Sequence, residues 1–385
     1  MLLGKSKMKV NFIVTQSFLR TKDKTDPFYD PIIRAIDGQR DIEWKVFVWQ
    51  RGVECGYSAD RVSDYWLFEK LGIWFYRVCH LLFWSVPVWK IYCWYGMLSR
   101  ILFSKKFDAD IVITQSGQFG ESLSSLLPHT RIVDIQHGVI YSRHSGYFGR
   151  DGRINEAWRR ASNREFWLYG QGYADCFFKH PDNGKDLKGR VKVIGDVIRA
   201  GEKVGVDSCS GRDGERDVVV FSLQLTADLS REEMSASVAK MEEFFADFFK
   251  RFGDKYVCYV KHHPRFNNVY DLSSFYAKFP QVKETKKLWT ELYDRMALHL
   301  TFNSTVTFDC ASHGVPTFLV DLPSAKIIMR NFYKDDYDYP YYDKSVSEIL
   351  ELPVEESRLI ILAWYHHFYT QFSVANCIQL LRGEV

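Results

Sequence analysis

The sequence has no paired-cysteine motif and no long, uninterrupted apolar run. Its eight cysteines stand far apart, without a C-x-x-C pair or a histidine at zinc-finger spacing, so we expect no structural zinc site. Several cysteines lie inside apolar stretches, as Cys258 does in YVCYV, which is typical of reduced core residues. The N-terminal apolar run is too short for a signal peptide. We therefore predict a protein of the reducing cytoplasm.

The sequence also lacks an excess of charge of either sign. Its 51 lysines and arginines stand against 48 aspartates and glutamates, which leaves a net charge of +3, and the basic residues are scattered. This balance argues against nucleic acid as a partner. The composition, 46% hydrophobic and 26% charged, is that of a folded protein. Because 385 residues exceed the ~250 to 300 at which a single core stops growing, two domains are predicted.

Two common nucleotide-binding signatures are absent, namely G-x-G-x-x-G and G-x-x-x-x-G-K-[ST]. A D-x-D that follows a strand and would hold a catalytic metal is absent as well. These absences disfavour a dehydrogenase and a kinase, and we expect no metal site and no cofactor. The acidic segment KDDYDYPYYD, residues 334–343, is predicted to be a surface loop.

Short apolar runs rich in β-branched and aromatic residues alternate with helix-capable segments along the first half. This alternation predicts an α/β fold with parallel sheets, in which ligands gather beyond the carboxyl ends of the strands. The runs expected to form strands are 9–16, 43–50, 109–115, 130–136, 164–170 and 190–196.

A polar, glycine-containing stretch, 207–217, separates this half from a second one with the same alternation. We therefore expect a Rossmann-like N-terminal domain over 1–205 and a Rossmann-like C-terminal domain over 206–355. Residues 356–385 are expected to form helices that pack back on the N-terminal domain. The second half is expected to contain strands at 218–225, 256–261, 297–302 and 317–321, with helices at 231–252 and 304–314.

The segment 71–98 is unusually aromatic and is interrupted by Arg77, His80, Pro87 and Lys90. These interruptions exclude a simple transmembrane span, which needs ~20 continuous apolar residues. Two interpretations remain for a helical insertion here. The first is a helical hairpin whose aromatic residues are buried, against the N-terminal sheet or in a dimer interface. The second is an interfacial helix pair that contacts the inner face of a membrane.

A predicted strand of the second half ends in VKHHPR, which brings Lys261, His263, Pro264 and Arg265 to the carboxyl edge of a sheet. Cations and imidazoles at such a place can neutralise a diphosphate leaving group and donate a proton to it. The alternative is a solvated turn that Pro264 stiffens.

A second polar cluster, formed by Asn303, Ser304 and Thr305, lies between a predicted strand and a predicted helix. A helix start offers unpaired N–H groups and the positive end of the helix dipole, so it can bind phosphate oxygens. The alternative is an ordinary helix cap. The helix is predicted to end at Gly314, before the strand that Pro316 opens.

These two motifs together resemble the donor half of GT-B glycosyltransferases, mainly over 218–322. The pattern is similar to capsule Kdo transferases, bacterial sialyl- and polysialyltransferases, and CDP-glycerol polymerases of surface-polymer synthesis. The resemblance implies a GT-B-like fold, with two Rossmann-type domains facing each other across a cleft. It also implies that His263, Ser304 and Thr305 contact the nucleotide and its phosphates. Gln224 lies in a Leu-Gln turn similar to that of the capsule group.

The N-terminal half contains DIQHGVIYSRHSGYFG, residues 134–149, after a predicted strand. The Gln-His-Gly at 136–138 resembles the His-Gly motif of the CDP-glycerol polymerases, which implies that His137 is the base. An acceptor hydroxyl needs a base to take its proton, and a neutral imidazole serves this purpose near pH 7. Asp134 and Glu121 are the alternative bases, and a purely structural role for His137 also remains open.

The acceptor is expected to contact polar residues at the same edge of the N-terminal sheet. The candidates are Ser116, Gly117, Gln118, Gln136, Gly138 and Arg143. The nearest match to the acidic-acidic-Gly triplet of bacterial sialyltransferases is Arg150-Asp151-Gly152, which lacks the first acid. A sialic acid donor is therefore disfavoured.

The sequence thus predicts a metal-independent transfer of a sugar from a nucleotide-activated donor to a hydroxyl of a surface glycan or a lipid-linked acceptor. Three alternatives remain. They are a CDP-glycerol-type glycerophosphotransferase, a non-catalytic sugar-binding partner of an assembly complex, and a sugar-nucleotide epimerase on the same two-domain plan.

Overall fold

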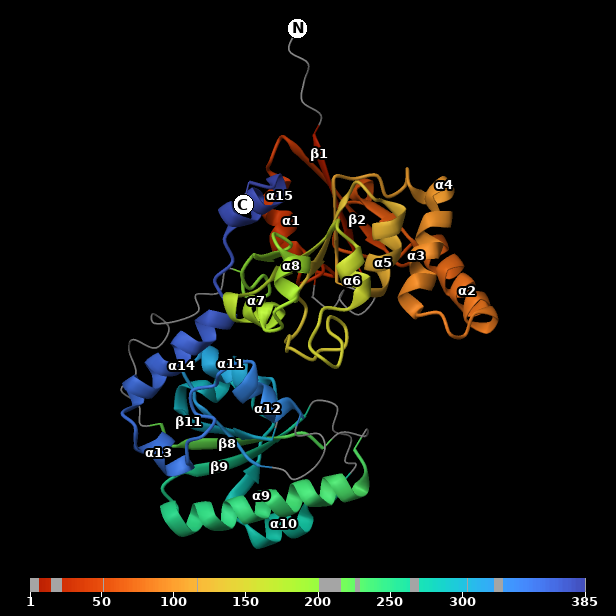
Figure 1. The fold of residues 1–385 in the computed structure, drawn as a ribbon. Coiled ribbons are helices and arrows are strands. Elements are labelled where there is room, and N and C mark those ends of the chain that lie inside the picture. The colour runs from red at the N-terminus through yellow and green to blue at the C-terminus, as the bar shows by residue number, and fades with distance from the viewer. Residues whose placement is uncertain are drawn as a thin grey trace. The chain divides into compact units, whose positions relative to one another are not determined.

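The computed structural model describes residues 7–14, 23–50, 52–115, 117–200, 216–225, 229–263, 270–302, 304–321 and 328–384. It divides into two compact units (Figure 1). Unit 1 comprises Met1–Gly201 together with Phe368–Val385, and unit 2 comprises Glu202–His367. Each unit contains its own parallel sheet and its own core, and each is described by itself.

Unit 1 contains a seven-stranded sheet in the order β3-β2-β1-β4-β5-β6-β7, with all strands parallel. The strand order reverses direction between β1 and β4, which is the position where open α/β sheets bind ligands. The strands are β1 Met8–Ile13, β2 Ile42–Val48, β3 Val62–Asp64, β4 Ile111–Thr114, β5 Arg131–Ile135, β6 Arg164–Leu168 and β7 Val191–Val193.

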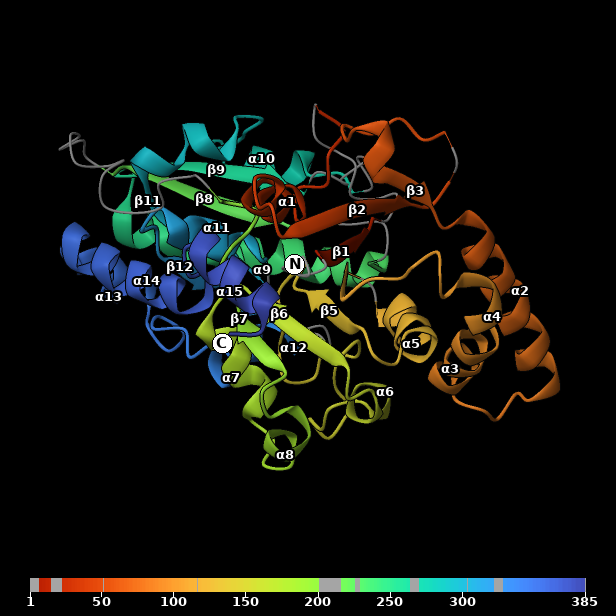
Figure 2. The ribbon, with the colours of Figure 1, turned by 90° about the horizontal axis from the view of Figure 1, so that it is seen from above.

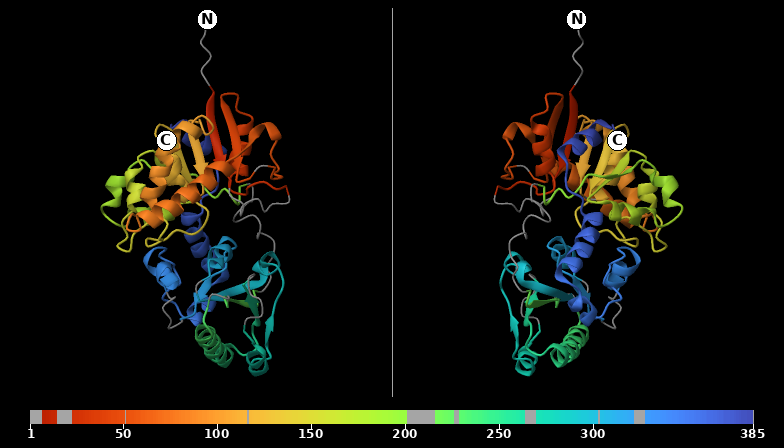
Figure 3. Two further views of the ribbon diagram at one scale, coloured as in Figure 1. Left: turned by 90° about the vertical axis from the view of Figure 1, so that its right-hand side faces the viewer. Right: turned by 90° about the vertical axis from the view of Figure 1, so that its left-hand side faces the viewer.

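The helices of unit 1 include a C-terminal one that returns from the far end of the sequence. Figure 3 shows this blue segment among the red and yellow elements of the unit. It contacts α1, and Arg131 at the start of β5 donates hydrogen bonds to the carbonyls of Leu380 and Leu381 at 3.0 and 2.7 Å. The helices are α1 Asp30–Asp37, α2 Trp66–Leu82, α3 Val88–Leu98, α4 Arg100–Phe103, α5 Gly117–Leu126, α6 Glu156–Arg160, α7 Gln171–Phe178, α8 Asn183–Leu187 and α15 Val374–Arg382.

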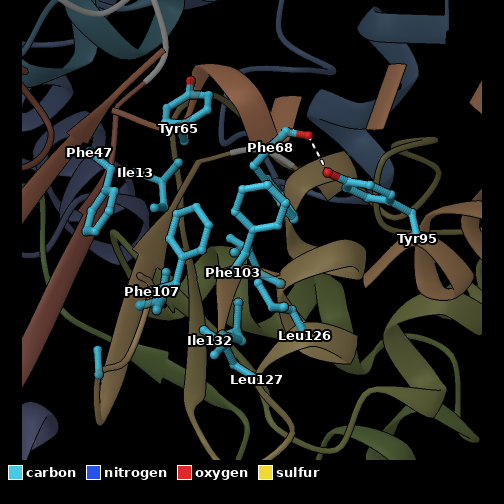
Figure 4. Close-up of a cluster of buried hydrophobic side chains, with 13 residues drawn as sticks. Ile13, Phe47, Tyr65, Phe68, Tyr95, Phe103, Phe107, Leu126, Leu127 and Ile132 are labelled. Atoms are coloured by element: carbon cyan, nitrogen blue, oxygen red, sulfur yellow. Dashed lines mark hydrogen bonds between the residues drawn. The ribbon is translucent and has the colours of Figure 1, made fainter. Parts of the chain in front are cut away.

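The predicted helical insertion is the pair α2 and α3, which lies beside α5 at one side of unit 1 (Figure 2). Its inner residues complete a core under the sheet, and the Tyr95 hydroxyl donates to the carbonyl of Phe68 (Figure 4). Gly96 allows α3 to approach α5 closely, because a Cβ there would lie 2.2 Å from the carbonyl oxygen of Ser122. Among the described residues, no helix is both long enough and apolar enough to cross a bilayer.

Unit 2 contains a five-stranded sheet in the order β10-β9-β8-β11-β12, with all strands parallel. The order in which successive strands are added reverses between β8 and β11. Its strands are β8 Val218–Leu223, β9 Val257–His262, β10 Val282–Glu284, β11 Met296–Thr301 and β12 Thr317–Leu319. Its helices are α9 Arg231–Phe252, α10 Ser273–Lys278, α11 Val306–Ser312, α12 Ile328–Asp335, α13 Val346–Glu351 and α14 Val354–Phe368.

The long helix α9 begins where the sequence predicts it. Ser230 accepts a hydrogen bond from the backbone of Glu233, whose side chain accepts one from the backbone of Ser230. This capping box satisfies two N–H groups that have no partner within the helix. Helix α11 ends at Ser312, two residues before Gly314, whose φ of +65° suits a glycine.

The structure corrects the prediction that 334–343 is a surface loop. Lys334 and Asp335 belong to α12, and the side chains of Tyr337, Tyr339 and Tyr341 are buried. The ring of Tyr339 packs against Trp364 of α14, at 4.9 Å between centroids. The phenolic rings supply enough apolar area to be buried despite the acidic neighbours.

In the structure the chain returns to unit 1 at Phe368, whereas the sequence predicts that the returning segment begins at 356. Most of α14 therefore belongs to unit 2, where the Trp364 indole donates to the carbonyl of Tyr337 at 2.7 Å. The short strands β3 and β10 were not predicted from the sequence.

Candidate functional site

The carboxyl edge of the unit 1 sheet carries a buried carboxyl group at the point where the strand order reverses. Asp26, which precedes α1, accepts hydrogen bonds through Oδ1 from the backbone of Phe28 and Tyr29 at 2.9 and 3.2 Å. Gln115, directly after β4, donates to the same oxygen at 3.2 Å. Burial outweighs these three donors and raises the pKa of Asp26 to about 7. Asp26 can therefore exchange a proton near neutral pH.

Three buried polar atoms near this edge have no hydrogen-bond partner among the residues that the structure describes. They are Asp26 Oδ2, Gln115 Oε1 and Tyr169 Oη. Tyr169 follows β6, and burial raises its pKa, followed by smaller effects that begin with the charge of Asp196 and end with that of Asp26. A buried polar atom without a partner is costly, so this place is suited to a buried water molecule.

The sequence missed Asp26 and Tyr169, and it placed Gln115 in a strand without giving it a role. One signal was present. The predicted strands 109–115 and 130–136 both end in glutamine. In parallel strands of one sheet, such residues meet at the same edge.

Asp134 lies near the end of β5, and its side chain is buried. The Tyr147 hydroxyl donates to Asp134 Oδ1 at 3.4 Å. Burial raises the pKa of Asp134 to about 7, although the nearby Arg164 guanidinium acts to lower it. Asp134 is 2% exposed, so an acceptor hydroxyl cannot reach it without a rearrangement of this core.

Glu121 of α5 belongs to the same buried charge cluster. Its Oε1 lies 3.8 Å from Arg164 Nη1, and burial raises the pKa of Glu121 while Arg164 opposes that rise. The Arg164 guanidinium lies 3.2 Å from the ring centre of Trp158, and burial lowers its pKa to about 10. These contacts favour a structural role for both carboxyl groups, as partners of one buried guanidinium.

His137 lies in the loop directly after β5, and its side chain is exposed. Partial removal of water by the surrounding protein lowers its pKa. His144 lies nearby, since the charge of His137 lowers the pKa of His144, in addition to the larger effect of burial. The ring of His144 packs between Tyr141 and Tyr147, at 5.1 Å from each ring centre. Both imidazoles are therefore neutral at pH 7 and able to accept a proton.

The predicted acceptor residues lie around this loop. Gln136 is buried, accepts from the Tyr169 backbone at 2.8 Å and donates to the Gly138 carbonyl at 2.7 Å, so it fixes the loop. Gly138 and Arg143 are exposed. Gly117 and Gln118 lie in the first turn of α5, where the backbone alone is described, and Ser116 falls outside the described residues.

In unit 2, the predicted donor residues of VKHHPR lie at the carboxyl end of β9, with Lys261 inside the strand and His263 directly after it. Lys261 Nζ donates to the Lys287 carbonyl, lies 5.4 Å from the Trp289 ring centre, and has a pKa that burial lowers. His263 is half-buried, and its backbone N–H donates to the Leu223 carbonyl at 3.1 Å.

The strand pairing brings a further predicted donor residue to this place. Leu223 of β8 pairs with His262 of β9, so Gln224, which is half-buried, and His263 follow neighbouring strand ends. Pro264 and Arg265 fall outside the described residues.

The predicted phosphate site at the start of α11 is partly occupied by the protein itself. Ser304 is buried, and its hydroxyl accepts from the backbone of Val306 at 3.2 Å. The Ser304 backbone N–H donates to the Thr301 hydroxyl at 3.1 Å. Thr305 is exposed at the N-cap and makes no capping hydrogen bond through its side chain. Asn303 falls outside the described residues.

A fully buried histidine that the sequence did not single out connects three strands of unit 2. His299 of β11 shares a hydrogen bond with Ser222 of β8 through Nε2, and one with Thr317 of β12 through Nδ1 at 2.9 Å. Burial lowers the pKa of His299 to about 3. Its role is structural. Among the described residues, no group of three or more His, Cys, Asp or Glu side chains is placed to hold a metal ion.

Comparisons with known proteins bear on the fold. No protein-family model matches the sequence, and no curated protein matches it. Among solved structures, the chain is similar to the apo form of the lipopolysaccharide outer core galactosyltransferase WaaB, with 10% identity and a TM-score of 0.51. The alignment covers 98% of this chain and 100% of that chain. The chain has the GT-B fold.

Two further structures with the GT-B fold are similar over nearly their whole lengths. One is UDP-GlcNAc 2-epimerase from Methanocaldococcus jannaschii, with 12% identity, a TM-score of 0.52, and coverage of 98% of this chain and 100% of that chain. The other is Arabidopsis thaliana UGT89C1 complexed with UDP, with 11% identity, a TM-score of 0.51, and coverage of 98% and 99%. The predicted α/β, GT-B-like fold is confirmed. The narrower resemblance to capsule and surface-polymer enzymes stays a prediction.

Proposed function

We propose that this protein is a glycosyltransferase that moves a sugar from a nucleotide-activated donor to a hydroxyl group of an acceptor. The GT-B fold supports the class, since the similar structures include a galactosyltransferase and a protein complexed with UDP. The observation that carries the proposal is the exposed imidazole of His137, next to His144, at the carboxyl edge of the unit 1 sheet. This edge is where α/β sheets bind ligands.

In the proposed reaction, His137 takes the proton of the acceptor hydroxyl. The acceptor oxygen forms a bond to the anomeric carbon, and the bond from that carbon to the nucleotide diphosphate breaks, with its electron pair passing to the diphosphate. A base whose neutral form predominates at pH 7 suits this step. His137 is exposed and has a lowered pKa, whereas Asp134 and Glu121 are held around Arg164.

The donor is proposed to bind at the carboxyl edge of the unit 2 sheet, where its strand order reverses between β8 and β11. Lys261 supplies positive charge there, and the strand ends carry Gln224 and His263. Ser304 and Thr305 follow β11 on the other side of the reversal. Fixed cations and N–H donors stabilise the charge that develops on a departing diphosphate. The proposed donor set also keeps Pro264, Arg265 and Asn303.

The acceptor is proposed to be a glycan or lipid-linked hydroxyl that binds around the loop after β5. Gly138 and Arg143 are exposed there, and Gln136 holds the loop in place. Gly117, Gln118 and Ser116 are proposed to line the same site from the start of α5. We propose that the transfer needs no metal ion, since lysine and arginine can neutralise the diphosphate.

One specific observation favours a second candidate, a nucleotide-sugar epimerase. The structure of UDP-GlcNAc 2-epimerase is as similar to this chain as that of the galactosyltransferase. An epimerase converts its nucleotide sugar when no acceptor is present, whereas a transferase needs the acceptor to form a product.

The test therefore has two stages. Thermal unfolding is first measured with UDP, CDP, GDP and CMP, because a ligand that binds the folded state raises the unfolding temperature. The nucleotide sugar of the best binder is then incubated with and without acceptor glycans. Conversion only with an acceptor supports the transferase, and product analysis distinguishes a glycosidic bond from a phosphodiester. Conversion without an acceptor shows an epimerase, and binding without any conversion shows a non-catalytic partner. If no nucleotide binds, the proposal fails.

A further inference from the structure

Most of the exposed large hydrophobic side chains among the described residues lie between Trp66 and Leu102, on α2, α3, α4 and the turn that joins α2 to α3. Leu81 and Trp84 at this turn are 82% and 81% exposed, and Ile101 of α4 is 94% exposed. We call this region the α2–α4 surface. Exposed apolar area concentrated in one place, as here, usually marks an interaction site.

The fold uses only one side of this hairpin. Phe68, Gly72 and Cys79 form the buried side of α2, at the spacing of one helix face. A second apolar row, which includes Leu67, Leu71, Trp74 and Leu81, follows the same helix at similar spacing and is exposed. The core of unit 1 explains the first row, and nothing in the described part of unit 1 covers the second.

The charged residues of the α2–α4 surface are mostly positive. Between Trp66 and Lys106 the sequence contains six lysines and arginines, and its only carboxyl group is Glu69, whose pKa is raised by burial. Four of these cations are exposed, namely Lys70, Arg77, Arg100 and Lys105. An apolar surface with tryptophans and a border of exposed cations is complementary to the headgroup region of an anionic bilayer.

We propose that the α2–α4 surface docks on a phospholipid bilayer with anionic headgroups. Leu81, Trp84 and their neighbours in the turn enter the boundary between headgroups and acyl chains, and Lys70 and Arg77 contact the headgroup phosphates. A second copy of the chain fits this surface less well. Two such surfaces would bring exposed cations together, with Glu69 as the one carboxyl of each to pair with them.

This inference goes beyond the proposed sugar transfer, and it is tested without any donor. The full chain is mixed with vesicles of phosphatidylcholine alone or with added phosphatidylglycerol, and the bound fraction is measured by flotation. We expect binding to the anionic vesicles, at least about tenfold weaker binding to the neutral ones, and release by salt. Equal binding to both vesicles, or none to the anionic ones, would overturn the proposal.

Two sets of variants locate the contact. L81E combined with W84E is expected to abolish flotation, and K70Q combined with R77Q to weaken it by about fivefold for each cation removed. The control is L288E in unit 2, because Leu288 is a comparably exposed leucine, at 68%. L288E should bind like the unchanged chain. Because all these side chains are exposed, their unfolding temperatures should stay close to that of the unchanged chain.

The same variants separate the other outcomes. If light scattering shows a dimer that L81E with W84E dissociates, and no vesicle binds, the surface is an interface between two copies and the bilayer proposal is wrong. Full flotation of L81E with W84E also contradicts it. Nucleotide binding, measured by thermal shift, should be unchanged in these variants, so failure here and failure of the proposed transfer can be told apart.

Discussion

Gln115 donates a hydrogen bond to Asp26 across the carboxyl edge of the unit 1 sheet, at 3.2 Å between Nε2 and Oδ1. The bond joins the end of β4 to the segment before α1, at the point where the strand order reverses. It leaves the second oxygen of Asp26 buried, without a partner among the described residues. Burial raises the pKa of Asp26 to about 7 in spite of this bond, so its charge changes near neutral pH.

D26N is expected to stabilise unit 1 at pH 8. The pKa of Asp26 is raised in the folded state to about 7, so ionisation costs folding free energy, and wild-type stability falls as pH rises from about 4 to 7. Asparagine keeps the accepting oxygen and carries no charge. We expect a gain of about 2 to 4 kcal/mol at pH 8 that disappears near pH 4, measured by urea unfolding. D60N, at an exposed position, should show no such gain.

H137A is expected to lower the transfer rate by about 100- to 10,000-fold if His137 is the base. Because burial lowers the pKa of His137 below the ordinary 6.5 of histidine, the acid-side midpoint of the wild-type pH–rate profile should lie below pH 6.5. The matched control is H129A, since His129 is an exposed histidine just before β5, at the opposite end of that strand. Equal rates for H137A and H129A would remove the proposed base.

K261Q is expected to weaken the binding of a nucleoside diphosphate by about tenfold, because one cation near a diphosphate is lost. The control is K255Q. Lys255 is exposed and lies just before β9, at the opposite end of this strand from Lys261. Calorimetric titration measures both affinities. Both variants should bind the uncharged nucleoside equally well. Weaker nucleoside binding by K261Q would indicate damage to the fold instead.

H299A is expected to destabilise unit 2 by about 2 to 4 kcal/mol, because it leaves a cavity and removes the partner of two buried hydroxyls. Burial lowers the pKa of His299 to about 3, so as the pH falls this histidine is protonated in the unfolded chain before it is protonated in the folded one. Wild-type stability is therefore full above pH 6.5 and is lost as pH falls toward 3. The acid-induced loss should be smaller in H299A, which denaturant unfolding at several pH values will show.

The sequence predicted the elements that one segment determines by itself. The apolar runs around Val112 and Val133 form β4 and β5, and Ser230 with Glu233 begins α9 as a capping box. Asp26 could not be found in this way, because its partner Gln115 is 89 residues away and the raised pKa arises from burial. The sequence suggested that Ser304 is available to a phosphate. In the structure its hydroxyl already accepts a hydrogen bond from the backbone N–H of Val306.

The aromatic segment shows the same limit. Its helices were predictable from composition, but the difference between the buried row of α2 and the exposed row depends on where α3 and α5 pack. The tyrosines of 334–343 were misjudged because their acidic neighbours dominate the pattern. Whether a phenolic ring is buried depends on the residues that pack against it, as Trp364 packs against Tyr339.

The return of α15 to unit 1 has a consequence for how the protein is made. Leu380 and Leu381 are buried in unit 1, and their carbonyls accept from Arg131. A ribosome delivers these residues after the whole of unit 2. Unit 2 is one continuous stretch of the chain and needs none of these residues, whereas unit 1 cannot complete its fold until they have left the ribosome. A released chain that is truncated after Thr370 should therefore keep unit 2 protected and leave unit 1 sensitive to protease.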